Sequence, residues 1–294
     1  MRDYLVYMRP RAIPATFVLA ATGYALAAPA GASVIHTARD LVILLIVYSV
    51  LGWGGANALN SSQDKDTGPV NLLVDPPPMP PRLAWFGVAS SALAIPLALL
   101  LSRTSALLTT LMFVLSIAYS VRLPGLRWRG KEVGVLDNLI NASGCGMLAV
   151  LLGASATGEA MTGRVILFGA AFSIAIFGGY PTTQIFQLQE GERYETARNF
   201  TSLVGPARAL RTSAACFAIH VIVVLALAAP LRGELTLWRA MLVVAWLALV
   251  ASACVASLRW ARAPFDRAYH RMTRQMATML TSQAALALAL WGIA

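Results

Sequence analysis

The sequence predicts an all-α membrane protein with about nine transmembrane helices. Of its 294 residues, 58% are hydrophobic and only 12% are charged, and the mean hydropathy is +0.67. A soluble protein of this length needs more charged residues to cover its surface. In addition, mostly apolar stretches of about 20 residues, the length that spans a bilayer, recur along the whole chain. Because no long polar linker separates them, we expect residues 1–294 to form a single polytopic transmembrane domain.

Nine apolar stretches can be placed in order. The first follows Arg2, Arg9 and Arg11 and lacks a convincing cleavage region, and eight more stretches follow it, so we expect a retained helix and not a signal peptide. The proline-rich run at 75–81 cannot continue a helix, because proline lacks the amide donor, and it separates the second and third stretches. The expected spans are 12–30, 41–60, 84–101, 104–121, 134–155, 163–185, 208–229, 238–258 and 275–293.

The net charge of +10 reflects membrane topology and does not indicate a nucleic-acid partner. If the N-terminus is cytoplasmic, 18 of the 23 Lys and Arg residues fall on the cytoplasmic side of these spans and 5 on the other side. This is the positive-inside bias of a polytopic protein. We therefore expect an integral protein of the cytoplasmic membrane, surrounded by membrane lipid, whose N-terminus and active-site face are cytoplasmic. Cys145, Cys216 and Cys254 lie singly in apolar stretches, which predicts neither a disulfide nor a cysteine metal site.

Polar residues gather at the end of the second stretch. Asn57, Asn60, Ser61 and Asp64 follow the i, i+3, i+4, i+7 spacing that places side chains on one face of a helix, and Asp66 comes directly after them. Their oxygens are ligands that suit Mg²⁺, which binds through one or two carboxylates together with substrate phosphates. The alternative is a capping or turn-forming segment, because Asn, Ser, Asp and Gly favour both.

A second acidic stretch ends the sixth span on the same expected side of the membrane. Gln184, Gln187, Glu190, Glu192 and Glu195 contribute its polar side chains. Gln187 and Glu190 are three residues apart, as are Glu192 and Glu195, so each pair can share a helix face. The alternative is a solvated loop whose Glu and Arg residues pair with one another.

A basic loop lies between these two stretches in the sequence. Tyr119 ends the fourth span, and Arg122, Arg127, Arg129 and Lys131 follow it. Arginine offers a fork that matches phosphate oxygens, although ordinary positive-inside charges would look the same. In combination, two acidic stretches and a basic loop on one face of a helical bundle indicate a site for a metal-bound diphosphate. An apolar interior would shield a cation formed as the diphosphate leaves.

These features resemble the UbiA superfamily of intramembrane prenyltransferases. The resemblance covers nearly the whole chain: the helix count, both acidic stretches, Tyr119 and Ser120 after the fourth span, and the NFTSLVG segment at 199–205. It implies nine helices that enclose a central chamber. It also implies Mg²⁺-dependent transfer of an isoprenyl group from a prenyl diphosphate to an aromatic or other lipophilic acceptor.

The resemblance carries over to individual residues. It implies that Asp64 and Asp66 hold one Mg²⁺ and that Glu190, with Glu192 or Glu195, holds the other. It places Tyr119 among the catalytic residues with Asp64, Asp66 and Glu190. The substrate-binding residues that it implies are Asn57, Asn60, Lys65, Arg122, Lys131, Gln187 and Arg198.

Some positions depart from the family pattern. Ser61 stands where the family often has Asp, Gln189 and Gly191 dilute the second stretch, and Glu replaces its usual Asp. Two alternatives to a transferase therefore stay open: a terpene cyclase of the same superfamily, which needs no acceptor, and a lipid-binding or transport homologue without catalysis. The sequence does not identify the acceptor, the prenyl chain length or the oligomeric state.

Overall fold

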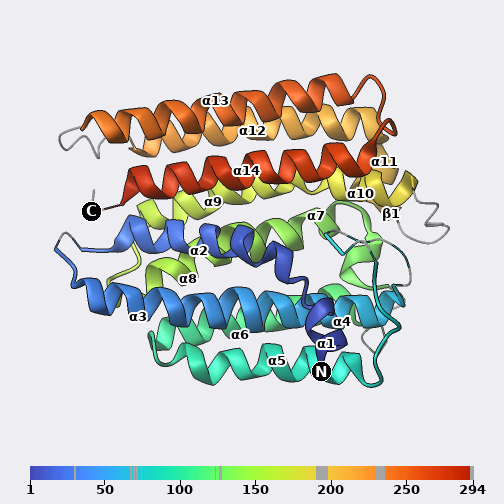
Figure 1. Cartoon of the computed structure of the whole chain (residues 1–294), viewed down its shortest axis with the longest axis horizontal. Helices are drawn as coiled ribbons and strands as arrows, with labels where there is room; N and C mark the ends of the chain where they lie inside the picture. Colours follow the sequence, from blue (N-terminus) through green and yellow to red (C-terminus); the bar gives the residue numbers. More distant parts are fainter. Residues whose placement is uncertain are drawn as a thin grey trace.

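The computed structural model is a bundle of roughly parallel helices (Figure 1). It describes all residues except 30, 67, 69, 71, 74, 123, 126–127, 190–197, 229–235 and 292–294. Apart from the two-residue strand β1 (Arg198–Asn199), the named elements in this part of the chain are helical. The predicted all-α membrane class is confirmed, since six helical segments are long and apolar enough to cross a membrane.

The N-terminal half contains the helices that correspond to four of the nine expected spans. Between the first and second of them the chain turns at one end of the bundle, and the second is a continuous rod whose middle is a π-helix. The elements are α1 (Arg2–Tyr7), η1 (Pro10–Ala12), α2 (Ile13–Ala27), α3 (Val34–Leu44), η2 (Leu45–Trp53), α4 (Gly54–Asp64), α5 (Leu83–Ala98) and α6 (Arg103–Ser120).

The C-terminal half contributes the other five. Its first span again contains a π-helical stretch, and its second is divided into α9 and α10 at Tyr180, where Pro181 cannot donate the backbone hydrogen bond of a regular helix. The elements are η3 (Gly130–Glu132), α7 (Gly134–Ala142), η4 (Ser143–Leu148), α8 (Ala149–Ser155), α9 (Gly163–Gly179), α10 (Pro181–Gln189), α11 (Phe200–Val204), α12 (Pro206–Ala228), α13 (Leu237–Trp260) and α14 (Ala268–Leu290).

Each of the nine expected spans coincides with a helix or helical rod of the described chain, and two expected starts were wrong. The second span begins at Val34 and not at 41, and the last begins at Ala268 and not at 275. Both early turns carry charged residues, for example Arg39 and Arg271, which lower hydropathy without interrupting the helix. Hydropathy reports the apolar part of a helix, whereas backbone hydrogen bonds set its length.

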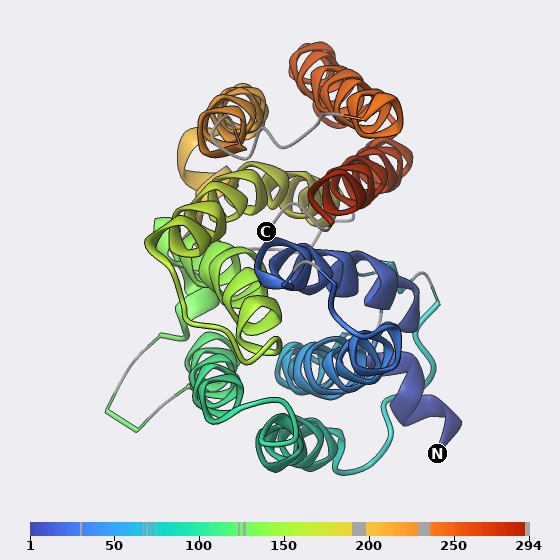
Figure 2. The same cartoon turned by 90° about the vertical axis from the view of Figure 1, so that its left-hand side faces the viewer.

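The helices pack in a sequence of neighbours across the molecule. α12 and α13 lie at one side and α5 and α6 at the other (Figures 1 and 2). α2 lies between them, where it contacts α8 and α14. Glycine makes the first of these contacts possible: a Cβ added at Gly153 of α8 would lie 1.8 Å from the carbonyl oxygen of Ala20, and one at Gly23 would lie 1.9 Å from that of Val150.

Candidate active site

An internal chamber of about 320 Å³ lies among these helices. Most of its wall is apolar, with Met112, Phe113, Phe172, Ile176 and Met279 among the lining side chains. Its polar lining includes side chains of α4, α6 and α7 and of residues that precede η1 and follow α9. α4 and α7 lie toward the right-hand end of the bundle in Figure 1. These polar lining residues are Arg9, Asn57, Asn60, Tyr119, Asn141 and Tyr180.

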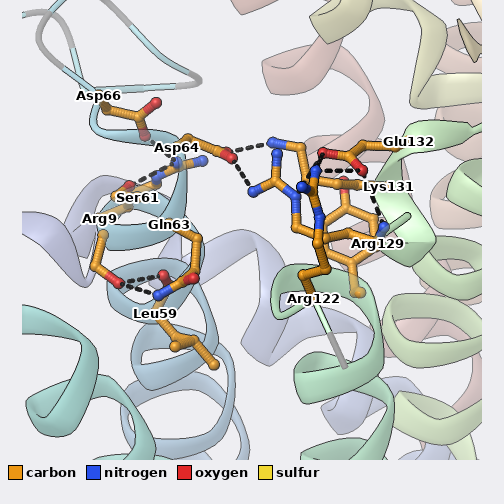
Figure 3. Close-up of polar contacts among 12 residues, drawn as sticks. Arg9, Leu59, Ser61, Gln63, Asp64, Asp66, Arg122, Arg129, Lys131 and Glu132 are labelled. Atoms are coloured by element: carbon orange, nitrogen blue, oxygen red, sulfur yellow. Dashed lines mark hydrogen bonds and ion pairs between the residues drawn. The ribbon is translucent and has the colours of Figure 1, made fainter. Parts of the chain in front are cut away.

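Asp64 ends α4 and meets two cations from the basic loop. Arg129 Nη1 donates to Asp64 Oδ1 at 2.8 Å, and Lys131 Nζ donates to Asp64 Oδ2. Figure 3 shows this carboxylate facing the η3 loop, away from its own helix. Arg129 is fixed in turn by Glu132, whose Oε1 accepts from Arg129 Nε at 2.8 Å. The cluster places two cationic donors beside the chamber.

Asp66 faces a different cation, although it is only two residues from Asp64. Its Oδ2 lies 3.6 Å from Arg9 Nη2, and both side chains are buried, with 6% and 7% exposure. Arg9 Nη2 also donates to Ser61 Oγ at 3.2 Å. Burial raises the pKa of the Asp66 carboxyl above its ordinary value, and Arg9 opposes that rise. The separation follows from Lys65, whose left-handed backbone (φ 56°) ends α4 between the two carboxylates.

The two tyrosines of the chamber wall meet at their hydroxyls. Tyr119 from α6 and Tyr180 from the α9–α10 junction form a hydrogen bond with each other. Behind them, Asp137 of α7 is 3% exposed, and its Oδ1 accepts from the Tyr119 hydroxyl at 3.3 Å. Gln184 of α10 donates to Asp137 Oδ2 and, at 3.0 Å, to Asn138 Oδ1. These hydrogen bonds connect three spans beside the chamber.

The first acidic stretch offers oxygen atoms that fit Mg²⁺. Asn60 Oδ1 and Asp66 Oδ2 are buried and have no hydrogen-bond partner. Asn57 donates through its amide nitrogen to Trp53 O at 2.9 Å, which turns its Oδ1 away from that helix carbonyl. The described residues contain no group of three His, Cys, Asp or Glu side chains that could hold a metal. A Mg²⁺ ion here would therefore use amide oxygens, one or two carboxylates, water and substrate phosphate.

The sequence-predicted residues do not all lie at the chamber. Asn57, Asn60 and Tyr119 line the chamber, and Asp64 and Lys131 meet beside it. Arg122 instead points to Glu132 at 3.4 Å with 61% of its side chain exposed, Lys65 is exposed, and Gln187 is half-buried in α10. Arg198 begins β1. Glu190, Glu192 and Glu195 lie outside the described residues.

Three residues of this region, Arg9, Asp137 and Glu132, were missed or counted only for topology, and Arg129 was named in the basic loop but not among the predicted substrate-binding residues. Arg9, Arg129, Asp137 and Glu132 carry most of the ion pairs and hydrogen bonds described above. Arg129 differs from the predicted Arg122 only by its position in the same loop, and no local pattern distinguishes them. Asp137 carried a usable signal: it is a carboxylate inside an apolar stretch, which is a functional hypothesis by default.

The comparisons with known proteins agree with the sequence resemblance. A model of the UbiA prenyltransferase family matches residues 16–292. A solved structure of a UbiA homolog from Archaeoglobus fulgidus bound to GPP and Mg²⁺ is 18% identical, with a TM-score of 0.63 over 97% of this chain and 99% of that one. The same homolog bound to DMAPP and Mg²⁺ is 19% identical, with a TM-score of 0.59 over 97% and 99%.

A third solved structure concerns digeranylgeranylglyceryl phosphate synthase in membranes. It is 14% identical, with a TM-score of 0.64 over 98% of each chain. No curated protein sequence matches the chain. At these identities the structural matches show a shared fold.

Proposed function

Because this chain belongs to the UbiA prenyltransferase family, we propose that it moves an isoprenyl group from a prenyl diphosphate to an aromatic or other lipophilic acceptor within the membrane. The observation that carries this proposal is the position of Asp64, Arg129 and Lys131 beside a chamber whose wall is mostly apolar. An amphiphile with a charged head and a hydrocarbon tail matches that arrangement.

The residues of the basic loop would bind the diphosphate. Arg129 and Lys131 now share the Asp64 carboxylate, and both are within reach of a diphosphate placed next to it. Arginine suits two phosphate oxygens at once, whereas lysine supplies a compact charge. Arg122, Arg198, Lys65 and Gln187 remain proposed contributors. As the diphosphate leaves with the electron pair of the C1–O bond, the Arg and Lys side chains would stabilise the developing negative charge.

The first acidic stretch would supply one metal site. Asn57, Asn60, Asp64 and Asp66 would hold Mg²⁺, which when bound neutralises diphosphate charge. Glu190, Glu192 and Glu195 are proposed to serve a second ion. The apolar wall would exclude water from the cation, and Tyr119 would lie beside it in the chamber wall.

The test is diphosphate release by the purified protein in lipid, with Mg²⁺ and prenyl diphosphates of several chain lengths. We expect Asp64→Asn to lower release by about 100-fold or more, the range for losing an electrostatic stabiliser. Asp3→Asn is the control, because Asp3 is an exposed carboxylate of α1. Folded wild-type protein that releases no diphosphate, with or without aromatic acceptors, would contradict the proposal and favour a lipid-binding homologue.

The products without acceptor would separate transferase from cyclase. The aromatic side chains of Trp53, Phe113, Tyr119 and Tyr180 line the chamber and could stabilise a cation that attacks its own chain. A cyclic hydrocarbon as the main acceptor-free product would favour the cyclase.

A further inference from the structure

Asp137 is arranged as a hydrogen-bond acceptor on both carboxylate oxygens. Oδ1 accepts from the Tyr119 hydroxyl at 3.3 Å and from Asn141 Nδ2 at 3.4 Å, and Oδ2 accepts from Gln184 Nε2. The orientation of the Gln184 amide is fixed from the other side, because its Oε1 accepts from the backbone N–H of Thr201 at 3.1 Å and from the Thr201 hydroxyl at 2.6 Å. All three side-chain partners therefore donate, as an ionised carboxylate requires.

The number of available hydrogens also fixes which of the two tyrosine hydroxyls donates to the other. Each hydroxyl has one hydrogen to donate. Tyr119 donates its hydrogen to Asp137, so Tyr180 must donate in the short contact between the two hydroxyls. The Tyr180 oxygen then keeps its lone pairs as acceptors, and Tyr180 lines the chamber. A continuous path for a proton runs from the chamber wall through Tyr180 and Tyr119 to Asp137.

This path begins beside the proposed reaction centre. Tyr119 is at the last turn of α6, against the η3 loop that carries Lys131. The contact is close, because a Cβ added at Gly130 would lie 3.2 Å from Tyr119 Cα. Lys131 itself binds Asp64. The tyrosine pair and the cations that would receive the diphosphate therefore approach the chamber at the same end.

We propose that Asp137 accepts the proton lost in the reaction and that Tyr180 and Tyr119 relay it. This inference rests on the proposed function. The C1–O bond breaks with its electron pair going to diphosphate, and C1 forms a bond to the acceptor atom. The acceptor's proton passes to the Tyr180 oxygen, the Tyr180 proton passes to Tyr119, and the Tyr119 proton passes to Asp137 Oδ1. Without an acceptor, the same path removes a proton from the prenyl cation itself and leaves an alkene.

The relay can be measured without knowing the acceptor. The substrate is the prenyl diphosphate from which diphosphate is released fastest. Its prenyl cation either loses a proton and gives an alkene, or captures water and gives an alcohol. The ratio of these products compares two fates of one intermediate, so it does not depend on the amount of folded protein. We expect Asp137→Asn and Tyr180→Phe each to lower the alkene-to-alcohol ratio at least about tenfold, within the range for general-base catalysis. Because ionisation precedes proton loss, the fall in this ratio should exceed any fall in total diphosphate release.

Tyr24→Phe is the matched control. Its hydroxyl also donates to a buried carboxylate, Asp40 Oδ2 at 3.4 Å, but Tyr24 is not among the lining residues of the chamber. We expect its product ratio to equal that of the wild type. If Asp137→Asn does not fold, Tyr180→Phe decides, because it removes a single hydroxyl from the chamber wall.

The outcomes distinguish the relay from the function beneath it. If the wild type releases diphosphate but forms only the alcohol, the relay is wrong and the proposed function stands. The same holds if both substitutions leave the alkene fraction unchanged. Equal losses of release and of alkene would indicate a structural role for the network and also overturn the relay. No release from folded wild-type protein would overturn the proposed function and the relay with it.

Discussion

At the scale of single residues, the chain separates two neighbouring carboxylates and gives each its own cation. Asp64 meets Arg129 and Lys131, whereas Asp66 meets Arg9. Ser61 supports the second of these pairs, because its hydroxyl oxygen accepts a hydrogen bond from Arg9. A residue that departs from the family's usual Asp thus helps to hold the cation of Asp66.

We expect Arg9→Met to destabilise the protein by up to about 3 kcal/mol, because it leaves the buried Asp66 carboxylate without its cation. Removing both charges in Arg9→Met with Asp66→Asn should recover at least half of that loss. Unfolding in lipid or detergent would measure both variants. Arg11→Met is the control, since Arg11 is exposed. If Arg9→Met lost no more stability than Arg11→Met, the result would contradict a stabilising ion pair between Arg9 and Asp66.

Glu132 provides a prediction for pH. Burial acts to raise its pKa, but hydrogen bonds from the Arg129 backbone and side chain outweigh burial, and the pKa is lowered below its ordinary value. A lowered pKa in the folded state stabilises the protein above the ordinary carboxyl pKa, and this contribution disappears as the pH falls through the folded value. We expect wild type to exceed Glu132→Gln in stability by about 1 kcal/mol or less near neutral pH.

The melting temperatures of the two proteins, measured from neutral pH downwards, would show this. They should converge in acid. A difference that stays constant or grows as the pH falls would contradict the ionised pairing of Glu132 with Arg129.

At the scale of helices, the contact between α2 and α8 depends on backbone approach. Gly23 and Gly153 face the carbonyl groups of Val150 and Ala20, so no side chain separates the two helices there. Small residues commonly mark such interfaces in membranes, where close van der Waals packing takes the place of the hydrophobic effect. Both helices also line the chamber, through residues such as Leu19 and Leu152. Their spacing therefore helps to set its width.

We expect Gly153→Ala to destabilise the fold by about 3 kcal/mol or more, because the new methyl group meets a backbone carbonyl that cannot rotate away. Gly144→Ala is the control in the same span, since a Cβ there has no atom within 4 Å. Replacing that helical glycine should be neutral or stabilising by up to about 1 kcal/mol. Thermal unfolding of the two variants would compare them, and equal stabilities would contradict the close contact.

At the scale of the whole molecule, the positions of the charges predict how the bundle sits in the membrane. The helix ends that carry Asp64, Lys131 and Tyr119 belong to the side on which 18 of the 23 Lys and Arg residues were counted. This bias predicts that the candidate active site faces the cytoplasm. The single polytopic domain over residues 1–294 stays a prediction of the same kind.

Cysteine labelling would test this orientation. In a background without Cys145, Cys216 and Cys254, we expect an impermeant thiol reagent to label Glu159→Cys on intact cells. Asp75→Cys should be labelled only after permeabilisation. Both positions are exposed, and they follow α8 and α4 at opposite ends of the bundle. The reverse pattern would place the active site on the outer face.

Much of the fold could be read from the sequence because membrane spans are a local property. Each span must be apolar over about 20 consecutive residues and must satisfy its own backbone hydrogen bonds, so its identity is written in one stretch of chain. The polar end of the second span was recognisable for the same reason: Asn57, Asn60 and Asp64 lie within two turns of one helix. The second acidic stretch at Glu190, Glu192 and Glu195 stays a prediction.

The sequence by itself thus determined the membrane class, the order of the spans and the first acidic stretch. The tertiary structure decided which cationic side chain pairs with each carboxylate and which tyrosine hydroxyls form a hydrogen bond with each other. Arg129 and Asp64 are 65 residues apart, Arg9 and Ser61 are 52 apart, and Tyr119 and Tyr180 are 61 apart. No helical period relates residues at such distances. Their contacts arise only when separate spans pack together, because packing between helices fixes the relative rotation and height that bring two side chains within hydrogen-bond distance.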